Sequence, residues 1–321
     1  MNKSSSTAAD ELQINPNLAL SLRAMLAETI DYAGLFPPAE LSLEAALKNH
    51  AQYVRSTDAW MLNTFVLPVG KFAAATSYFS SFDSEYPLRI SALMGKSETK
   101  SDFESKLSEM VGAIRELQSR HGESVSVVQL EIALPPDCDL SLLGALCSVT
   151  ESLGVRVFCE APPAIAGKTI ALLAQVDTSR SAPLGYKLRT GGVTADAFPD
   201  SNEIARALVT AGRDQVPIKF TAGLHHPVRQ FRQEVQTKMH GFLNVLGAGI
   251  LAPEHGWDEA TAAIMLDDEE INSFTFDDKT FGWREWKIPT DAIRSRRHFV
   301  TSFGSCSFDE PRDDLRDLGL L

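Results

Sequence analysis

The chain alternates short β-rich runs with segments whose apolar residues recur every three to four positions, and this alternation constrains the fold most. It begins near residue 30 and continues toward the C-terminus. Such a pattern is typical of parallel strands joined by crossover helices. The predicted strands are 30–35, 60–68, 88–94, 125–134, 155–160, 185–190 and 217–222. The predicted helices between them are 41–55, 69–81, 101–120, 139–153, 163–176 and 199–213.

Two segments compete for the eighth strand, because 273–286 and 298–303 both have a β-rich composition. We prefer 298–303, since a helical pattern at 310–320 follows it and completes an eighth β/α unit. The long insertion 229–297 before it must then hold structure of its own, because loops in such units usually have about two to six residues. Within it we expect helices at 229–251, 258–270 and 290–297, with a hairpin or lid edge at 273–288.

These elements predict a single-domain (β/α)8 TIM barrel over residues 18–321. It has an N-terminal helical extension at 18–29 and the insertion 229–297 between its last two strands. A doubly wound open sheet is the alternative. Residues 1–17 are polar and are expected to form a flexible N-terminal tail.

Composition restricts the partners. The sequence has 30 Lys and Arg against 42 Asp and Glu, a net charge of −12, so nucleic acid and anionic membranes are poor partners. We expect a cytoplasmic protein, since no apolar stretch is long enough to span a membrane and no export signal is visible. The four cysteines form no metal-binding or redox pattern, which fits buried thiols in a reducing compartment. The sequence does not reveal the oligomeric state, and a homo-oligomer is one possibility.

Charged residues interrupt the apolar strands near their C-terminal ends, where TIM barrels carry their active sites. They are Asp31, Glu131, Glu160, Lys187, Arg189 and Lys219. Side chains alternate along a strand, so Lys187 and Arg189 share one face while Tyr186 and Leu188 share the other. The two cations should therefore face the barrel mouth.

Two buried lysines close together would lower the pKa of one amine, which could then attack a carbonyl carbon and form a Schiff base. Glu131 could shuttle the protons. The alternative is that Glu131, Lys187, Arg189 and Lys219 form only a buried ion-pair cluster.

The loops after the strands offer further candidates. His225 and His226 follow the Lys219 strand, and because adjacent side chains on an extended segment point in opposite directions, only one should face the pocket. A metal site made by Glu131, Glu160 and His225 is a second possibility. The glycine-containing turns after Arg189 and at residues 304–307 could hold a phosphate or carboxylate through backbone amides.

Several of these segments resemble the deoxyribose-phosphate aldolase family, class I aldolases on an (α/β)8 barrel. The similar segments are Ile30-Asp31-Tyr32, Glu131-Ile132-Ala133-Leu134-Pro135, Glu160, Lys187-Leu188-Arg189-Thr190-Gly191, Lys219-Phe220-Thr221-Ala222-Gly223 and Phe303-Gly304-Ser305-Cys306-Ser307. The resemblance implies that Lys187 forms the imine and that Lys219 lowers its pKa. It also implies that Glu131 stands where the family uses an aspartate, with Asp31 as a supporting acid.

The chain departs from the family pattern at Arg189, where the family carries a small hydroxyl residue. Arg189 could hold a substrate carboxylate, which suggests a keto acid or an acidic aldehyde, or it could neutralise Glu131. We therefore expect an aldolase-like lyase that acts on a small carbonyl compound and needs no cofactor or metal. A metal-assisted enzyme and a non-catalytic metabolite-binding barrel are the alternatives. The predicted substrate-binding residues are Glu160, Arg189, Thr190, Gly191, Thr221, Gly223, His225, His226, Gly304 and Ser305.

Overall fold

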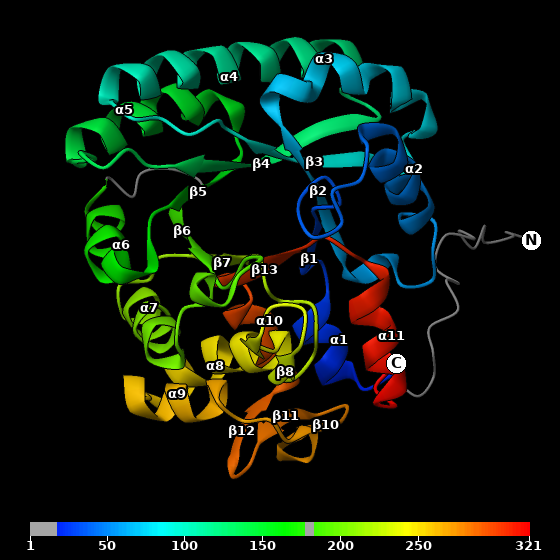
Figure 1. Cartoon of the computed structure of the whole chain (residues 1–321), viewed down its shortest axis with the longest axis vertical. Helices are drawn as coiled ribbons and strands as arrows, with labels where there is room; N and C mark the ends of the chain where they lie inside the picture. Colours follow the sequence, from blue (N-terminus) through cyan, green and yellow to red (C-terminus); the bar gives the residue numbers. More distant parts are fainter. Residues whose placement is uncertain (1–17, 177–182) are drawn as a thin grey trace, which may run out of the picture.

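Eight parallel strands close into a barrel in the computed structural model, which describes residues 18–176 and 183–321. Their order around the barrel is β1-β13-β7-β6-β5-β4-β3-β2 (Figure 1). The strands are β1 (Ile30–Tyr32), β2 (Leu62–Pro68), β3 (Leu88–Leu93), β4 (Val125–Ala133), β5 (Arg156–Glu160), β6 (Leu184–Arg189), β7 (Ile218–Thr221) and β13 (Val300–Ser305). The TIM-barrel prediction is confirmed, including the choice of the eighth strand. The tail expected at 1–17 lies outside the described residues.

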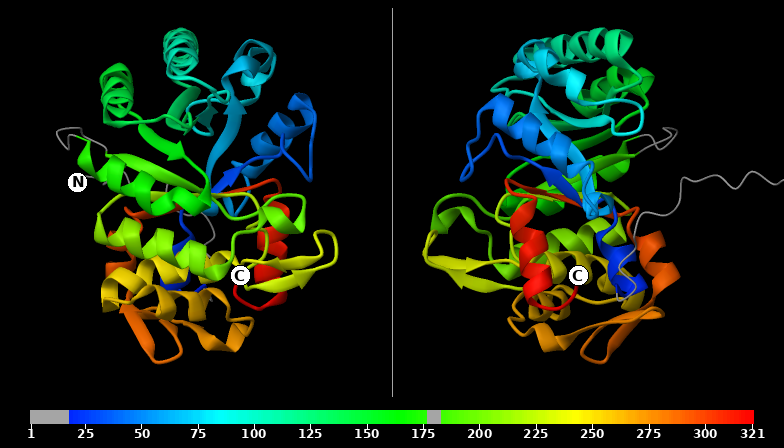
Figure 2. Two further views of the ribbon diagram at one scale, coloured as in Figure 1. Left: turned by 60° about the vertical axis from the view of Figure 1, so that its left-hand side comes forward. Right: turned by 90° about the vertical axis from the view of Figure 1, so that its right-hand side faces the viewer.

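Helices surround the strands, as both views of Figure 2 show. They are α1 (Leu20–Leu26), α2 (Leu43–Tyr53), α3 (Phe72–Ala75), α4 (Lys100–His121), α5 (Leu140–Thr150), α6 (Ala166–Gln175), α7 (Ser201–Arg213) and α11 (Asp309–Asp317). Side-chain caps fix several starts: Ser42, Thr99 and Asp139 each accept a backbone N–H from the first turn. Asp200 and Glu203 form a complete capping box at α7.

Two local predictions need correction. The first strand ends at Tyr32 rather than at residue 35, because the chain turns at Gly34, where a Cβ would lie 2.3 Å from the Tyr32 hydroxyl. The helix predicted at 69–81 is broken into η2 (Val69–Lys71), α3 and η3 (Thr76–Ser81). Asp31 still lies within the shortened β1, and the strands that carry the other charged residues are not affected by either change.

The insertion contains two small sheets, three α-helices and the short 3-10 helix η7 (Ile271–Ser273). They are β8 (Gln230–Arg232), β9 (Thr237–Met239), α8 (Phe242–His255), α9 (Glu259–Leu266), β10 (Phe274–Phe276), β11 (Thr280–Trp283), β12 (Trp286–Pro289) and α10 (Thr290–Arg296). The helix predicted at 229–251 is wrong over its first half. There the chain forms the β8–β9 hairpin, whose turn needs a left-handed backbone at Gln236 (φ 54°).

The aromatic segment predicted as a hairpin or lid edge forms the three-stranded sheet β10-β11-β12, which lies outside α8 and α9 (Figure 1). Trp283 is buried, and its ring lies 5.6 Å from that of Trp257. Phe281 is fully buried as well. These aromatics therefore serve packing. Among the helices of residues 18–176 and 183–321, none is long and apolar enough to cross a bilayer.

Candidate active site

The strand register brings three charged residues into one row across the barrel wall. Glu160 on β5 pairs with Lys187 on β6, and Lys187 pairs with Lys219 on β7. Neighbouring strands lie about 4.8 Å apart, so these side chains start as close neighbours. The predicted alternation is confirmed: Tyr186 and Leu188 are fully buried, whereas Lys187 and Arg189 both reach Glu160.

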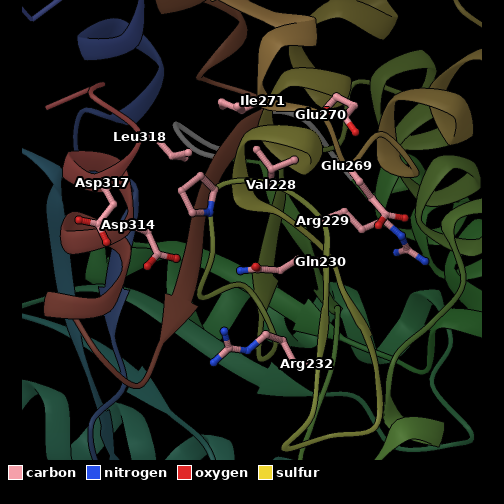
Figure 3. A pocket seen from close by; sticks show the side chains of 11 residues that line it. Val228, Arg229, Gln230, Arg232, Glu269, Glu270, Ile271, Asp314, Asp317 and Leu318 are labelled. Carbon is pink, nitrogen blue, oxygen red and sulfur yellow. The ribbon is translucent and has the colours of Figure 1, made fainter.

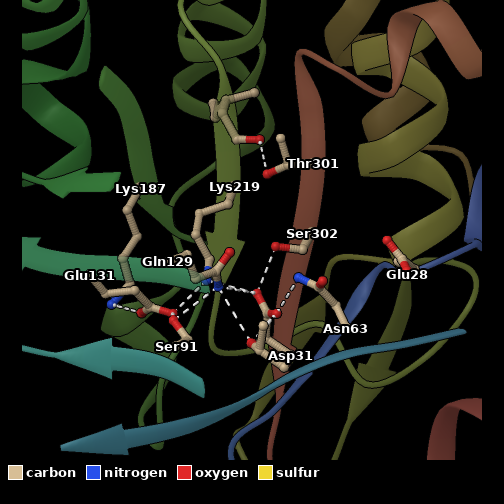
Figure 4. Close-up of polar contacts among 12 residues, drawn as sticks. Glu28, Asp31, Asn63, Ser91, Gln129, Glu131, Lys187, Lys219, Thr301 and Ser302 are labelled. Carbon is tan, nitrogen blue, oxygen red and sulfur yellow. Dashed lines mark hydrogen bonds and ion pairs between the residues drawn. The ribbon is translucent and has the colours of Figure 1, made fainter. Parts of the chain in front are cut away.

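The charged side chains form one chain of ion pairs, shown in part in Figure 4. Lys219 Nζ lies 2.7 Å from Asp31 Oδ2 and 2.5 Å from Glu131 Oε1. The other oxygen of Glu131 lies 2.7 Å from Lys187 Nζ. Lys187 Nζ also lies 2.7 Å from Glu160 Oε2. Glu131 therefore holds both lysines, one on each carboxylate oxygen.

Asp31 lies at the inner end of this series of ion pairs. It is fully buried and accepts four side-chain hydrogen bonds besides its ion pair with Lys219. The donors are Asn63 at 2.7 Å, Thr64 at 2.6 Å, Gln129 at 3.2 Å and Ser302 at 2.6 Å. Such a set of donors stabilises an ionised carboxylate in a low-dielectric interior. Asp31 is therefore built as a fixed counter-ion for Lys219.

Sequence reasoning missed this polar layer, together with Ser91, which donates to Glu131 at 2.7 Å. A signal was available, since Gln129 stands two residues before Glu131 and so shares its face of the strand. Thr64, Ser91 and Ser302 likewise are hydroxyl residues inside apolar strands. Each is individually common in strands, so only their joint position inside a closed barrel shows their role.

Electrostatics fixes the charge of the two innermost groups. Burial alone would raise the pKa of the Glu131 carboxyl, but Lys187 and Lys219 outweigh it and hold the pKa well below its usual range. Burial alone would lower the pKa of Lys219, but Asp31 and Glu131 outweigh it and raise the pKa above its ordinary value. Glu131 is thus a permanent anion and Lys219 a permanent cation at neutral pH. The sequence predicted two lysine amines and the Glu131 carboxylate close together, but not that Glu131 would lie between the two amines.

The outer end of this series of ion pairs, at Glu160, reaches solvent. The exposed fraction of the side chain is 1% for Lys219, 5% for Lys187 and 16% for Glu160. Arg189, half-exposed, lies 3.6 Å from the second oxygen of Glu160 and does not neutralise Glu131. Of the two amines, Lys187 is therefore the one that a molecule entering at the mouth would meet.

The two histidines both turn toward α11, which corrects the expectation that only one would face the pocket. Ala222 (φ 63°) and Gly223 (φ 74°) have left-handed backbones, so the segment before the histidines is not extended and the alternation rule does not apply. His225 Nδ1 lies 3.1 Å from Glu310, and His226 Nδ1 lies 2.6 Å from Asp314.

The surroundings of His225 shift its pKa. Its burial opposes the charged form, but hydrogen bonds with Cys306 and Glu310 outweigh that and raise the pKa of His225 to about 9. Ser305 lies 3.5 Å from the same ring nitrogen. His225 is therefore held as a cation against the C-terminal helix instead of joining Glu131 and Glu160. Within residues 18–176 and 183–321, no three His, Cys, Asp or Glu side chains are placed to share a metal ion.

The predicted loop residues mainly shape the backbone. Thr190 Oγ1 donates to the carbonyl of Ala222 at 2.6 Å. Gly191 and Gly223 pack on each other and on Phe198, since a Cβ on either would come within 3.0 Å of the other's Cα. Gly304 lies inside β13 beside Thr221, whose Oγ1 would be 3.2 Å from an added Cβ. These close approaches hold the ends of β6, β7 and β13 in register.

A cavity of about 360 Å³ lies between the β8 segment and α11 (Figure 3). Arg229, Arg232 and four acidic residues line it: Glu269, Glu270, Asp314 and Asp317. The two arginines already pair with Asp267 and Glu234, and Asp314 pairs with His226. Its charges are thus largely satisfied within the protein.

Comparison with known proteins places the chain in no family. No family model matches the sequence, and no curated protein matches it. Among solved structures, a protein from Acinetobacter baumannii described as a probable 2-pyrone-4,6-dicarboxylic acid hydrolase aligns at 12% identity and TM-score 0.33, over 60% of this chain and 69% of that one. A triazine hydrolase from Arthrobacter aurescens aligns at 11% identity and TM-score 0.34, over 62% of this chain and 53% of that one.

A Coccidioides immitis protein described as belonging to the dihydrodipicolinate synthase family aligns at 12% identity and TM-score 0.34, over 85% of this chain and 94% of that one. Likenesses this distant carry no argument about chemistry. They give no support to the deoxyribose-phosphate aldolase family. The TIM-barrel assignment does not need them, because the closed barrel of eight parallel strands shows it directly.

Proposed function

We propose that the protein is a lyase-type enzyme that makes or breaks a bond next to the carbonyl carbon of a small substrate through an imine on Lys187. The observation that carries the proposal is the position of Lys187 Nζ, 2.7 Å from each of two carboxylates at the C-terminal end of the barrel. This is the end at which TIM barrels perform their chemistry. Lys219 is too deeply buried and too tightly paired to act as the nucleophile.

The paired carboxylates suit the cationic intermediate. Lys187 must first give up a proton, after which its neutral amine attacks the carbonyl carbon, water leaves, and an iminium cation forms on the same nitrogen. The negative charges of Glu131 and Glu160, which pair with the ammonium, would also stabilise the positive charge of this iminium, which keeps a single N–H to donate to one of them. Preorganised charges of this kind stabilise an intermediate without reorganisation during the reaction.

The geometry favours Glu160 over Glu131 for the proton transfers. Glu131 is held as an anion by two lysines and by Ser91, so its affinity for a proton is low. Glu160 contacts the same lysine and is more exposed, so it can exchange protons with solvent or substrate. Arg189, half-exposed beside it, offers a guanidinium to a substrate carboxylate. A keto acid or an acidic aldehyde therefore fits the mouth best.

Borohydride trapping tests the proposal. The full-length protein is incubated with a panel of aldehydes and keto acids, reduced, and examined by intact mass and peptide mapping. We expect a covalent adduct on Lys187, lost in Lys187→Met and retained in the control Lys100→Met, whose lysine is exposed on α4. Circular dichroism establishes that both variants are folded. Wild-type protein without any adduct, or an equal yield from Lys187→Met, contradicts the imine.

A further inference from the structure

A second polar cavity lies at the opposite, N-terminal end of the barrel, where the strands begin. Its volume is about 280 Å³. We call it the N-terminal cavity, and its polar lining includes Glu28, Asn63, Arg89, Gln129, Arg156 and Arg297. It lies at the other end of the barrel from Lys187, and the lining does not include that residue, so binding there can be tested whether or not the imine forms.

The charge of this lining is opposite to that of the whole protein. Three arginines face one carboxylate, that of Glu28, which gives 3 − 1 = +2 from these groups. The complete chain carries −12. Among the three arginines of the lining, Arg89 alone forms an ion pair with a carboxylate of the lining, that of Glu28 at 3.0 Å. The cavity is thus a local excess of positive charge in an acidic molecule.

Arg297 is held rigidly and still has an unused donor. Its guanidinium donates to the carbonyls of Val300, Thr301 and Ala27. Its Nε is enclosed, yet it finds no hydrogen-bond acceptor within residues 18–176 and 183–321. Burial, and then the charge of Arg156, lower the pKa of Arg297 to about 9. A buried donor without an acceptor, close to another cation, is costly unless an anion is present.

The floor of the cavity is the polar layer beneath the lysine site. Asn63 and Gln129 border the cavity and donate to Asp31, the counter-ion of Lys219 (Figure 4). Both amide N–H groups of Gln129 are used by Asp31 and Ser91, whereas Asn63 gives one of its two N–H groups to Asp31 and can offer the other as a neutral donor beside the arginines. Guanidinium groups together with amide donors are the groups that recognise phosphate oxygens.

We propose that the N-terminal cavity binds a small multivalent oxyanion, either free phosphate or the phosphoryl group of a small metabolite. Arg156 and Arg89 supply the approachable charges, while Arg297 supplies a fixed one. The volume exceeds that of a phosphate ion, so it admits an organic group attached to the phosphoryl oxygen.

Isothermal titration calorimetry on the full chain tests this site, with inorganic phosphate and glycerol 3-phosphate as probes at constant ionic strength. The variants are Arg156→Gln and Arg89→Gln. Arg206→Gln is the matched control, because it makes the same charge change on the exposed side of α7, where Arg206 pairs with Glu259. Unfolding curves establish that all three proteins fold.

We expect saturable binding that weakens about tenfold in each cavity variant and changes by less than about twofold in the control, as for loss of one charge-assisted hydrogen bond. Tighter binding of glycerol 3-phosphate supports a metabolite as the occupant, and tighter binding of phosphate supports the free ion. Absence of saturable binding for both probes overturns the proposal. Equal weakening in all three variants also overturns it, since net charge alone would then account for the effect.

Discussion

Replacing Glu131 by glutamine should destabilise the protein strongly, because this one carboxylate holds both lysines. The exposed fraction of Glu131 is 2%, and it pairs with Lys187 at 2.7 Å and Lys219 at 2.5 Å. Glutamine keeps the shape and can still accept the hydrogen bond from Ser91. The change therefore removes the charge, and it also replaces one accepting oxygen beside Lys187 or Lys219 by an NH2 group that cannot accept.

The magnitude follows from these contacts. Two unit charges about 4 Å apart attract by about 4 kcal/mol at an effective dielectric constant near 20, so two pairs contribute about 8 kcal/mol. Several kcal/mol of this are offset, because the neutral glutamine escapes the desolvation cost of a buried carboxylate. The net loss should be about 3–5 kcal/mol, a large part of the roughly 5–15 kcal/mol that stabilises a typical protein.

Urea unfolding at neutral pH measures this loss, with Glu116→Gln as the matched control. Glu116 pairs with Arg120 on the surface of α4, and both are well exposed, so its loss should cost at most about 1 kcal/mol. A loss below about 1 kcal/mol for Glu131→Gln would refute the electrostatic reasoning, because removing one partner of a buried ion pair leaves the other charge uncompensated.

The pH dependence gives the same experiment a second readout. The folded pKa of Glu131 is depressed, so its contribution is fully present above the unfolded value of about 4.5 and is lost as pH falls toward the folded pKa. The difference in unfolding free energy between wild type and Glu131→Gln should therefore be constant near neutrality and shrink below about pH 4.5. A difference that grows on acidification would contradict the assignment of Glu131 as an anion.

Two further predictions concern the loop after β7. The folded pKa of His225 is raised from 6.5 to about 9, so the stability it contributes is complete below pH 6.5 and lost as pH rises to about 9. Because solvent screens the half-exposed Glu310, the unfolding free energy of the wild type should fall by only about 2 kcal/mol over this pH range. The fall should be smaller in Glu310→Gln, and an equal fall in both proteins would contradict the pairing of His225 with Glu310. Gly223→Ala should lower the unfolding free energy by about 2–4 kcal/mol, because φ is 74° and the added Cβ would lie 2.8 Å from Phe198. Gly256→Ala is the control and should lower it by about 1 kcal/mol, because φ is 63° there but the space around the Cβ is open. Equal costs in thermal unfolding would mean that the close packing at Gly223 adds no strain.

The barrel could be predicted from the sequence because its evidence is local. Alternating strand and helix periods recur unit by unit, and each charged interruption marks a strand end without knowledge of its neighbours. The β8–β9 hairpin escaped because its strands have three residues each, too few for a period of two to be distinguished from a helical one. The sequence did not predict that both histidine side chains point toward α11, because this direction depends on left-handed backbones at Ala222 and Gly223.

The pairing within the site could not be predicted, because it depends on register between strands far apart in the sequence. Lys219 meets Glu131 across 88 residues of sequence and Asp31 across 219 − 31 = 188 residues. Sequence reasoning placed the charges at the correct end and on the correct face. It did not show that each lysine amine would stand between two carboxylates.

This pairing also bears on whether the charges serve structure alone. A buried ion-pair network is seldom the most stable way to fill a barrel, since apolar residues of similar volume often stabilise a protein as well or better. The network here is graded, from the enclosed pair Lys219–Asp31 to Glu160 and Arg189 at the mouth. A purely structural cluster has no need of such a gradient, whereas a site must leave one amine accessible and fix the charges behind it. Lys187, whose side chain is 5% exposed, stands between the enclosed pair and the mouth, and the proposed imine on this residue would account for the gradient.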